Sequence, residues 1–192
     1  MAQFKIAEEI TGRNEGGYAN DPADNGGETF AGIARNFWPK WDGWKFIDKY
    51  KSDYAKLNKP MRDKYSLAKW INSSAKVTSE PVAPLVSAFY KTNFWDVNKL
   101  DAVQDQQLAN TVYDFGVNSG TGRAAKLLQS CVGVVQDGKI GPQTLAAVNR
   151  LDAEVTHDKY NSGREAFYRS IAEGSQAKFL KSWLSRLKPY KV

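Results

Sequence analysis

The sequence of 192 residues predicts a mainly α fold of the α+β kind, in which a single compact helical domain carries a small N-terminal lobe rich in loops or β-structure. Three observations predict this class. Apolar residues recur at helical spacing in segments between residues 4 and 187. Glycine, proline and asparagine gather between residues 16 and 27, where they favour turns. The length fits one domain with a sizeable core, and no stretch is long enough to link independent domains.

The first predicted helix covers residues 4–14, and its apolar positions fall on one side at helical spacing: Phe4, Ile6, Ala7 and Ile10. Gly16 and Gly17 end this helix, as glycine does at a C-terminal cap. The next segment reads as a loop rather than a strand or a helix. Residues 20–22 (NDP) favour a turn, and residues 25–27 (NGG) permit positive φ.

Carboxylates at the end of this helix and in the loop are the groups that glycoside hydrolysis uses. On a helical wheel Glu15 falls near Phe4, at the edge of the apolar stripe. Partial desolvation there raises a carboxyl pKa, which suits a general acid. Asp24 and Thr29 follow on the loop and can face Glu15 across a cleft. The alternative is equally simple: Glu15 is a surface residue at a helix end, and Asp24 caps a turn.

A central helix is predicted over residues 101–115, and Gly116 ends it. Asn118 follows, where its amide can either reach a cleft or cap a helix. The remaining predicted helices cover residues 59–73, 80–94, 122–132, 142–151, 162–173 and 175–187. An aromatic stretch before them either packs as a cluster under a loop or stacks on sugar rings: Phe37, Trp38, Trp41, Trp44 and Phe46.

Charge and composition limit the classes of binding partner but do not identify one. The formal net charge is +6 and the pI is about 9.3, which favours polyanionic partners such as nucleic acid, an anionic membrane or a bacterial wall. Nucleic acid is the weaker option, because no run of five basic residues and no zinc-finger or RNA-binding motif occurs. A basic, solvated surface without a specific partner is the plain alternative.

The single cysteine and the single histidine argue against several classes of site. One cysteine excludes an intramolecular disulfide, and Cys131 lies in an apolar helical run that predicts a core position. His157 lies between charged residues and is predicted to sit in a solvated loop. One residue of each kind argues against a zinc site or a Ser-His triad, and no Walker or dinucleotide motif occurs. No cofactor is therefore expected.

The N-terminus lacks an apolar signal core, and no apolar run reaches eighteen residues. The sequence therefore predicts synthesis in the cytoplasm without a signal peptide, and no stable membrane insertion. Three routes to a cell wall stay open: lysis of a phage or prophage host through a separate membrane-opening protein, nonclassical export, or a signal already removed.

The run from Glu15 to Ala34 (EGGYANDPADNGGETFAGIA) resembles the signature of the glycoside hydrolase family 108 muramidases. These are lysozyme-like proteins, some of them once labelled secretion activators. Four later segments resemble segments of that family in the same order: Phe89-Tyr90 with Phe94-Trp95, Phe115–Gly120, Asp137–Leu145 and Phe179–Arg186. The third of these resembles the DG-x-IG-x-x-T signature of a C-terminal part that is often described as a peptidoglycan-binding region.

The resemblance implies a lysozyme-like catalytic region over residues 1–96 and a helical C-terminal region over residues 97–192, packed into the same globule. It also implies that Glu15 is the catalytic acid. The order Glu, Asp, Thr is similar to that of phage-type lysozymes, although Thr29 stands one residue closer to Asp24 than in that pattern. Asp21 therefore stays a rival for the second carboxylate. No role is transferred to Asp114, because the family more often has Phe-Asp where this chain has Asp-Phe.

The expected protein is a monomeric muramidase that binds peptidoglycan glycan strands and cleaves the β-1,4 bond from N-acetylmuramic acid to N-acetylglucosamine. Glu15 protonates the glycosidic oxygen. Asp24 and Thr29 hold the attacking water, or Asp24 stabilises the oxocarbenium-like transition state. Resemblance to phage-type lysozymes favours inversion over retention. Asn118 and Tyr18 are candidate substrate contacts, although Tyr18 can equally be a core residue.

Two other functions stay open. The chain can be a noncatalytic wall-binding or secretion-accessory protein, although the intact Glu15 and its loop argue against a degenerate enzyme. It can also hydrolyse another aminosugar polymer, such as chitin or chitosan. Fold resemblance alone does not choose among these activities.

Overall fold

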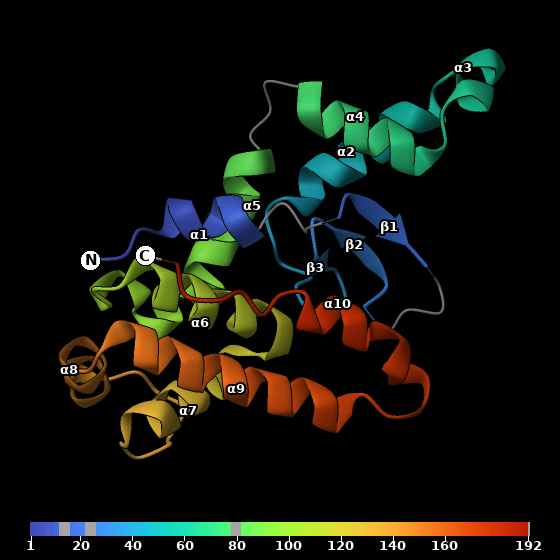
Figure 1. The fold of residues 1–192 in the computed structure, drawn as a ribbon. Coiled ribbons are helices and arrows are strands. Elements are labelled where there is room, and N and C mark those ends of the chain that lie inside the picture. The colour runs from blue at the N-terminus through green and yellow to red at the C-terminus, as the bar shows by residue number, and fades with distance from the viewer. Residues whose placement is uncertain (12–15, 22–25, 78–81, 192) are drawn as a thin grey trace. The chain divides into compact units, whose positions relative to one another are not determined.

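The computed structural model describes residues 1–11, 16–21, 26–77 and 82–191 (Figure 1). The described chain is mainly helical with one three-stranded sheet, which confirms the predicted class. It divides into two compact units. The sheet-bearing unit is Thr11–Tyr90, and the helical unit combines Met1–Ile10 with Lys91–Val192.

The sheet consists of β1 (Tyr18–Asn20), β2 (Glu28–Phe30) and β3 (Ile33–Ala34), paired antiparallel in that order. Strands therefore form within the segment predicted to be a loop. Three residues are too few to show the alternation that identifies a strand in a sequence, and pairing with neighbours supplies the missing order. One face of the sheet is buried in the core and carries Tyr18, Phe30 and Ile33.

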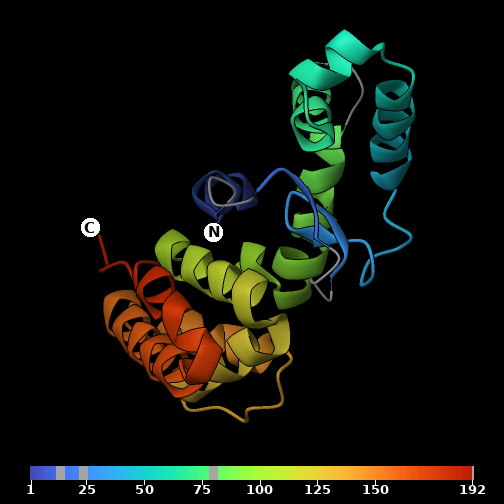
Figure 2. The ribbon, with the colours of Figure 1, turned by 90° about the vertical axis from the view of Figure 1, so that its right-hand side faces the viewer.

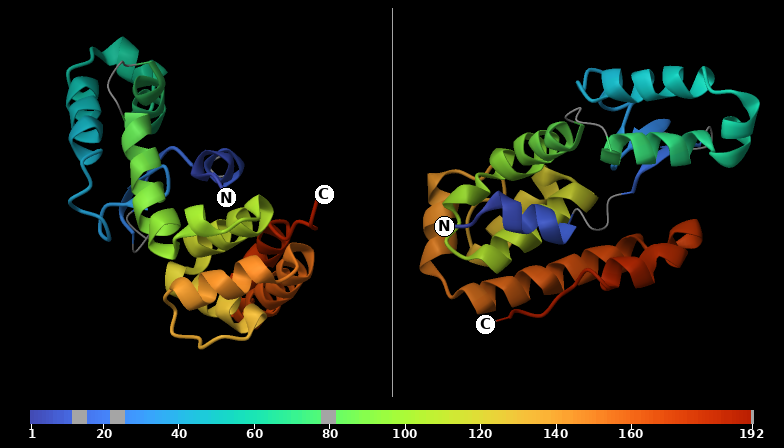
Figure 3. Two further views of the ribbon diagram at one scale, coloured as in Figure 1. Left: turned by 90° about the vertical axis from the view of Figure 1, so that its left-hand side faces the viewer. Right: turned by 90° about the horizontal axis from the view of Figure 1, so that it is seen from above.

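Four helices complete the sheet-bearing unit: α2 (Trp44–Ala55), α3 (Lys59–Lys64), α4 (Leu67–Val77) and α5 (Val82–Tyr90). Helices α2 and α4 lie side by side, and α3 joins them at one end (Figure 3). The single helix predicted over residues 59–73 is thus two helices. The break falls where Tyr65 is extended and the Ser66 hydroxyl accepts a hydrogen bond from the Lys69 amide at 3.2 Å.

The aromatic stretch before and within α2 packs into the core of this unit, as the first of its two interpretations predicted. Trp44 is 3% exposed, and its indole N–H donates to the carbonyl of Trp38 at 2.8 Å. The Trp41 ring lies edge-to-face with Trp44, at 5.2 Å between centroids. Phe37 and Trp38 are the exceptions, because 67% and 39% of them are exposed.

The N-terminal helix α1 (Phe4–Thr11) packs with the C-terminal helices, although it is distant from them in sequence. It contributes Phe4 to the core of the helical unit. The Phe4 ring packs edge-on against Trp95 and Tyr113, at 5.7 Å from each. The predicted apolar stripe of this helix is only partly correct. Phe4 and Ala7 are buried, whereas Ile6 and Ile10 are 40% and 54% exposed.

The rest of the helical unit is built around α9, which runs along α6 and α7 (Figures 1 and 2). Its elements follow in chain order: the π-helix η2 (Lys91–Trp95), the 3-10 helices η3 (Asp96–Asn98) and η4 (Leu100–Ala102), then α6 (Gln106–Ser119), α7 (Thr121–Val132), α8 (Pro142–Arg150), α9 (Ala153–Ile171), the 3-10 helix η5 (Gly174–Phe179) and α10 (Leu180–Leu184). No helix in the described part of the chain is both long and apolar enough to cross a membrane.

The central helix α6 begins later and ends later than predicted. The Asp105 carboxylate caps its N-terminus by accepting from the Leu108 amide at 2.6 Å. Gly116 does not end the helix. The start of α7 packs against this position: a Cβ on Gly116 would lie at ordinary contact distance from Thr121 and Ala124, 3.7 and 3.8 Å. Gly120, with φ of +93°, ends the helix instead.

The prediction for the C-terminal helices was wrong in its boundaries and in the environment of His157. A single helix, α9, begins after the N-cap Asp152 and runs for 19 residues. His157 lies inside this helix and is fully buried, with its Nε2 3.1 Å from the hydroxyl oxygen of Thr111. Its charged neighbours in sequence lie on the outer side of the helix. They therefore do not indicate the environment of His157, which points to the other side.

One carboxylate connects three segments of the helical unit. Asp114 on α6 accepts hydrogen bonds from Arg164 on α9 and, at 2.8 Å, from Arg186 beyond α10. The Arg164 side chain is only 2% exposed, so its charge depends on Asp114 for compensation. Arg164 also lies over the rings of Phe115 and Tyr168.

Replacing Asp114→Asn should destabilise the protein by about 3 kcal/mol, because it leaves the buried Arg164 charge uncompensated. Urea denaturation followed by circular dichroism measures this change. The matched control is Glu165→Gln, which removes an exposed pair with Arg169 on the same helix α9 and should cost no more than about 0.5 kcal/mol. Equal costs for the two variants would contradict the role given to Asp114.

Stability should also fall in mild acid because of His157. Burial lowers the pKa of His157 below its ordinary value of 6.5, and nearby Arg164 adds to this, while Asp158 opposes it. The folded state therefore binds fewer protons than the unfolded state, and the free energy of unfolding drops as the pH falls below about 6.5. Between about pH 7.5 and pH 5 we expect a loss of stability that His157→Gln abolishes. An unchanged pH profile in that variant would count against this assignment.

Candidate active site

The two principal carboxylates of the predicted site, Glu15 and Asp24, lie outside the described residues. Their neighbours in the sheet-bearing unit are described. Glu15 precedes β1 in the chain, and Asp24 belongs to the connection between β1 and β2. Asp21, the rival carboxylate, directly follows β1 and is exposed. The described part of the candidate site is therefore the segment that follows Glu15, together with strands β1 and β2.

The backbone immediately after Glu15 is held by Asn72 of α4. The Asn72 side-chain oxygen accepts a hydrogen bond from the Tyr18 amide at 2.7 Å. A Cβ on Gly17 would lie 2.3 Å from the same oxygen, so this approach requires glycine. A Cβ on Gly16 would meet nothing within 4 Å. The second glycine of the EGGY motif thus has a packing reason that the first does not share.

The Tyr18 side chain is anchored as firmly as its backbone. Tyr18 is 6% exposed, and its hydroxyl donates to a carboxylate oxygen of Glu28 at 2.8 Å. Burial, followed by the hydrogen bond to Glu28, raises the pKa of Tyr18 well above its ordinary value, so the hydroxyl keeps its proton. Of the two roles open for Tyr18, these contacts favour core packing over the wall of a sugar-binding cleft.

Glu28 is the centre of a charged network that sequence reasoning did not find. Its carboxylate accepts from Lys51 at 2.7 Å and from Arg35 at 2.6 Å, and its side chain is 10% exposed. Arg35 also binds Asp48 through two hydrogen bonds of 2.7 and 2.6 Å. Burial alone would raise the pKa of Glu28, but the hydrogen bonds from Lys51, Arg35 and Tyr18 outweigh it and hold the pKa below its ordinary value. These bonds favour the ionised form of Glu28, which anchors the network.

Thr29 lies in the middle of β2, on the opposite face of the sheet from Glu28. Its partners across the sheet are Ala19 and Ala34. Thr29 is half-buried, and its hydroxyl donates to the Gly27 carbonyl at 3.2 Å. This face of the sheet therefore offers one hydroxyl among small side chains, whereas the other face carries the large rings.

Asn118 lies in the last turn of α6 rather than beyond the helix. It is exposed, and its amide donates to the Asp114 carbonyl at 2.6 Å and to the Asp114 carboxylate at 3.3 Å. These bonds support the Asp114 network within the helical unit. A substrate contact by Asn118 stays a prediction.

The Asp137–Leu145 segment is organised by a buried glutamine of α7. Gln129 donates to the Asp137 carboxylate at 2.7 Å and accepts from the Gly138 amide at 2.9 Å. Thr144, at the start of α8, lies 3.3 Å from the same side chain. The spacing of this motif thus has a structural role: it lets Gln129 hold the turn before α8 closed.

The described residues contain no cluster of three or more His, Cys, Asp or Glu side chains that could hold a metal ion. Cys131 is half-buried on α7, and burial raises the pKa of its thiol to about 11. A thiol with that pKa is protonated at neutral pH and is a poor nucleophile.

Residues 8–120 match the model of the family described as glycosyl hydrolase 108. The chain belongs to this family. Residues 123–188 match a second model, described as a predicted peptidoglycan domain. The chain is therefore a lysozyme-like glycoside hydrolase, and together the two matches identify a peptidoglycan hydrolase that acts at the cell wall. The resemblance inferred from the sequence motifs is confirmed.

Among solved structures, the glycosyl hydrolase is similar to the chain described as "Structure of Brucella abortus SagA". The two are 29% identical, with a TM-score of 0.66, and the match covers 96% of this chain and 88% of that one. No curated protein sequence matches the chain.

The Gly17–Asn72 contact should control the rate of hydrolysis. Gly17→Ala should lower kcat on peptidoglycan by about tenfold or more with little change in KM, because the new methyl group displaces the backbone next to Glu15. Gly16→Ala, which meets no neighbour, should have a clearly smaller effect. Adding Asn72→Ala to Gly17→Ala removes the obstructing amide and should restore part of the loss. Equal effects of the two glycine variants would contradict this steric account.

Proposed function

We propose that the enzyme is an N-acetylmuramidase that cleaves the β-1,4 bond between N-acetylmuramic acid and N-acetylglucosamine, with Glu15 as general acid. The observation that carries this proposal is the glycosyl hydrolase 108 match over residues 8–120, which contains the whole EGGY segment. Cleavage of a glycosidic bond requires a proton for the departing oxygen, and a carboxylic acid of raised pKa supplies it.

The contacts of the sheet-bearing unit support a positioning role for the residues that follow Glu15. Tyr18 is fixed through its amide by Asn72 and through its hydroxyl by Glu28. A general acid contributes only if it is held within hydrogen-bonding reach of the leaving oxygen. Only Gly16 and Gly17 separate Glu15 from this anchor, so the anchor lies close to the proposed acid in the chain.

The proposed second group is Asp24, assisted by Thr29. In an inverting reaction the two carboxyls stand about 6.5–9.5 Å apart and leave room for a water, whereas about 5–5.5 Å indicates retention. We propose inversion, with Asp24 and the Thr29 hydroxyl holding the water. Thr29 suits this role because it is half-buried on a face of small side chains, where a sugar or a water can approach. Asp21 is the rival carboxylate.

The proposed division of labour assigns catalysis to residues 1–96 and wall binding to residues 97–192, with Asn118 as a further contact with the glycan. The match of residues 123–188 to a peptidoglycan domain supports the second assignment. We further propose that the protein is a monomer and reaches the wall by phage or prophage lysis or by nonclassical export.

Replacing Glu15→Gln should lower the cleavage of purified peptidoglycan by at least about a hundredfold, because an amide cannot donate the required proton. Mass spectrometry of soluble fragments from the wild type should show reducing N-acetylmuramic acid ends. Folding, measured by thermal melting, and sedimentation with the wall should be unchanged. Wild-type turnover by the variant would refute the assignment of the acid.

The second carboxylate is identified by the same assay. Asp24→Asn should cost less than Glu15→Gln, and Asp21→Asn should be nearly neutral. A larger loss in Asp21→Asn than in Asp24→Asn would transfer the role to Asp21. Fragments that end in reducing N-acetylglucosamine would instead assign a different bond.

A further inference from the structure

The net charge of the chain is concentrated in one segment. Residues 40–77 contain ten basic and four acidic side chains, a net charge of +6 that equals the formal net charge of the whole protein. The remaining residues are balanced. Nine of the ten basic side chains in this segment are lysines. The excess positive charge therefore belongs to the stretch that forms α2, α3 and α4 of the sheet-bearing unit.

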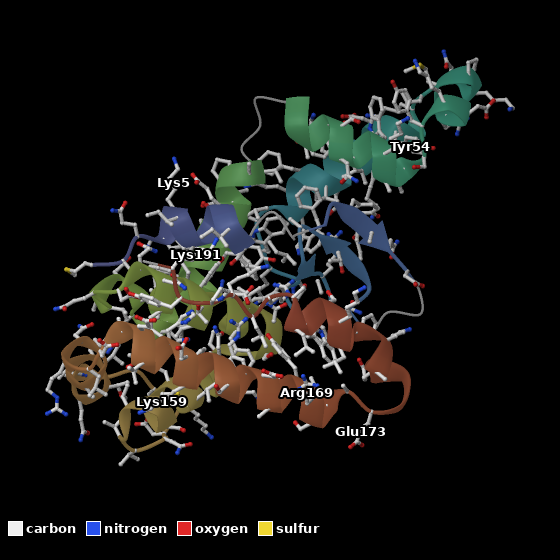
Figure 4. All side chains as sticks on the ribbon, viewed as in Figure 1. Lys5, Tyr54, Lys159, Arg169, Glu173 and Lys191 are labelled. Atoms are coloured by element: carbon white, nitrogen blue, oxygen red, sulfur yellow. The ribbon has the colours of Figure 1, made fainter. Side chains whose placement is uncertain are left out.

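Seven of these basic side chains are exposed on the three helices or, for Lys56, directly after α2. The side chain of Lys49 on α2 is 53% exposed and that of Lys59 on α3 is 81% exposed. We use the name basic helical surface for the exposed members of the set: Lys45, Lys49, Lys56, Lys59, Arg62, Lys64 and Lys69. Helices α2 and α4 lie side by side with α3 at their end, so the three helices form one continuous part of the unit (Figures 3 and 4).

The few carboxylates among these helices do not neutralise the surface. Four of its lysines form exposed ion pairs that water screens: Lys45–Asp42 at 3.6 Å, Lys49–Asp53 at 3.5 Å, Lys56–Asp53 at 3.7 Å and Lys59–Asp63 at 2.8 Å. Two other lysines lie against an aromatic ring instead. Lys64 and Lys69 place their ammonium groups 5.4 and 5.2 Å from the centroid of Tyr65. A ring face orients a cation without cancelling its charge, so these ammonium groups stay available to an anion.

We propose that the basic helical surface binds the free carboxylates of peptidoglycan stem peptides, as a wall contact additional to residues 123–188. The proposal rests on the proposed substrate. Free carboxylates recur along the peptides of the wall, and lysine offers compact, flexibly placed charges that suit such dispersed anions. The two family matches identify a peptidoglycan hydrolase, so the carboxylates of its own substrate are favoured over the phosphates of nucleic acid.

A lipid surface fits this part of the molecule less well. Binding to a membrane interface combines basic side chains with exposed apolar side chains that enter the acyl boundary. Among the described residues of α2, α3 and α4, Met61 is the one exposed large apolar side chain, at 36%. The large rings nearby, such as Tyr54 (Figure 4) and Trp70, pack against each other at 6.4 Å and donate to backbone carbonyls.

The test compares two triple variants of equal charge in a Glu15→Gln background, which leaves the wall undigested. The surface variant is Lys49→Gln, Lys59→Gln and Lys69→Gln, with one change on each helix. The control variant is Lys5→Gln, Lys99→Gln and Lys191→Gln, at exposed positions of the helical unit that lie outside the peptidoglycan-domain match of residues 123–188. Each lowers the net charge by three, and glutamine preserves helix propensity. Circular dichroism verifies that both variants fold.

Binding is measured by sedimentation with purified peptidoglycan sacculi and with sacculi whose carboxyls have been amidated. The surface variant should bind untreated sacculi about tenfold more weakly than the control variant at low salt, and the difference should vanish in about 0.5 M salt. The control variant should bind amidated sacculi as weakly as the surface variant binds untreated ones.

Equal binding by the two triple variants would overturn the proposal, as would full binding of the control variant to amidated sacculi. A selective loss of binding to anionic lipid vesicles or duplex DNA, with wall binding retained, would assign the surface to that partner instead. The readout is binding rather than cleavage. Failure of the muramidase assignment would therefore appear in the fragment analysis and leave this result interpretable.

Discussion

The buried carboxylate of Glu28 is the interaction on which the sheet-bearing unit depends. Strands of three, three and two residues are too short to form a stable sheet alone. Glu28 connects β2 to Tyr18 of β1, to Arg35 after β3 and to Lys51 of α2. Removing a carboxylate from water costs free energy. The arrangement is favourable only when charged partners surround the carboxylate. The sheet is therefore held through side chains where its backbone ladder is too small.

The helical unit uses the same device around Asp114. Its two arginine partners come from α9 and from the chain beyond α10, so one carboxylate fixes the C-terminal segment against the central helix. In both units a charge that water would otherwise solvate specifies which elements meet. Apolar packing alone tolerates alternatives, whereas an unpaired buried charge does not.

The sequence predicted the helices with clear apolar periodicity, such as α7 and α8, and the family from its motifs. It could not predict contacts between distant residues. Gly116 resembles a helix end until α7 is known to pack on it. His157 resembles a solvated residue until α9 is known to turn it inward. Glu28 belongs to the motif of residues 15–34, yet its role depends on ion pairs with Arg35 and Lys51, which come from other parts of the fold. Its one local signal is the two-residue spacing from Phe30, which places both on the inner face of β2.

The same distinction explains the EGGY motif and the charge of the chain. Two adjacent glycines look equivalent in a sequence, but only Gly17 faces Asn72, so only that position excludes a side chain for steric reasons. The net charge of +6 is a property of the whole chain, but the excess basic residues lie in the segment that forms α2, α3 and α4. The positive charge is therefore localised on one part of the sheet-bearing unit. On a polymeric substrate, retention on the wall and cleavage of the bond can be carried out by different residues. Dispersed, screened contacts can retain an enzyme on a wall, while cleavage requires a few groups held to within a fraction of an ångström. In the sheet-bearing unit, the exposed lysines have the properties of the first kind of contact, and the Gly17–Tyr18 anchor has those of the second.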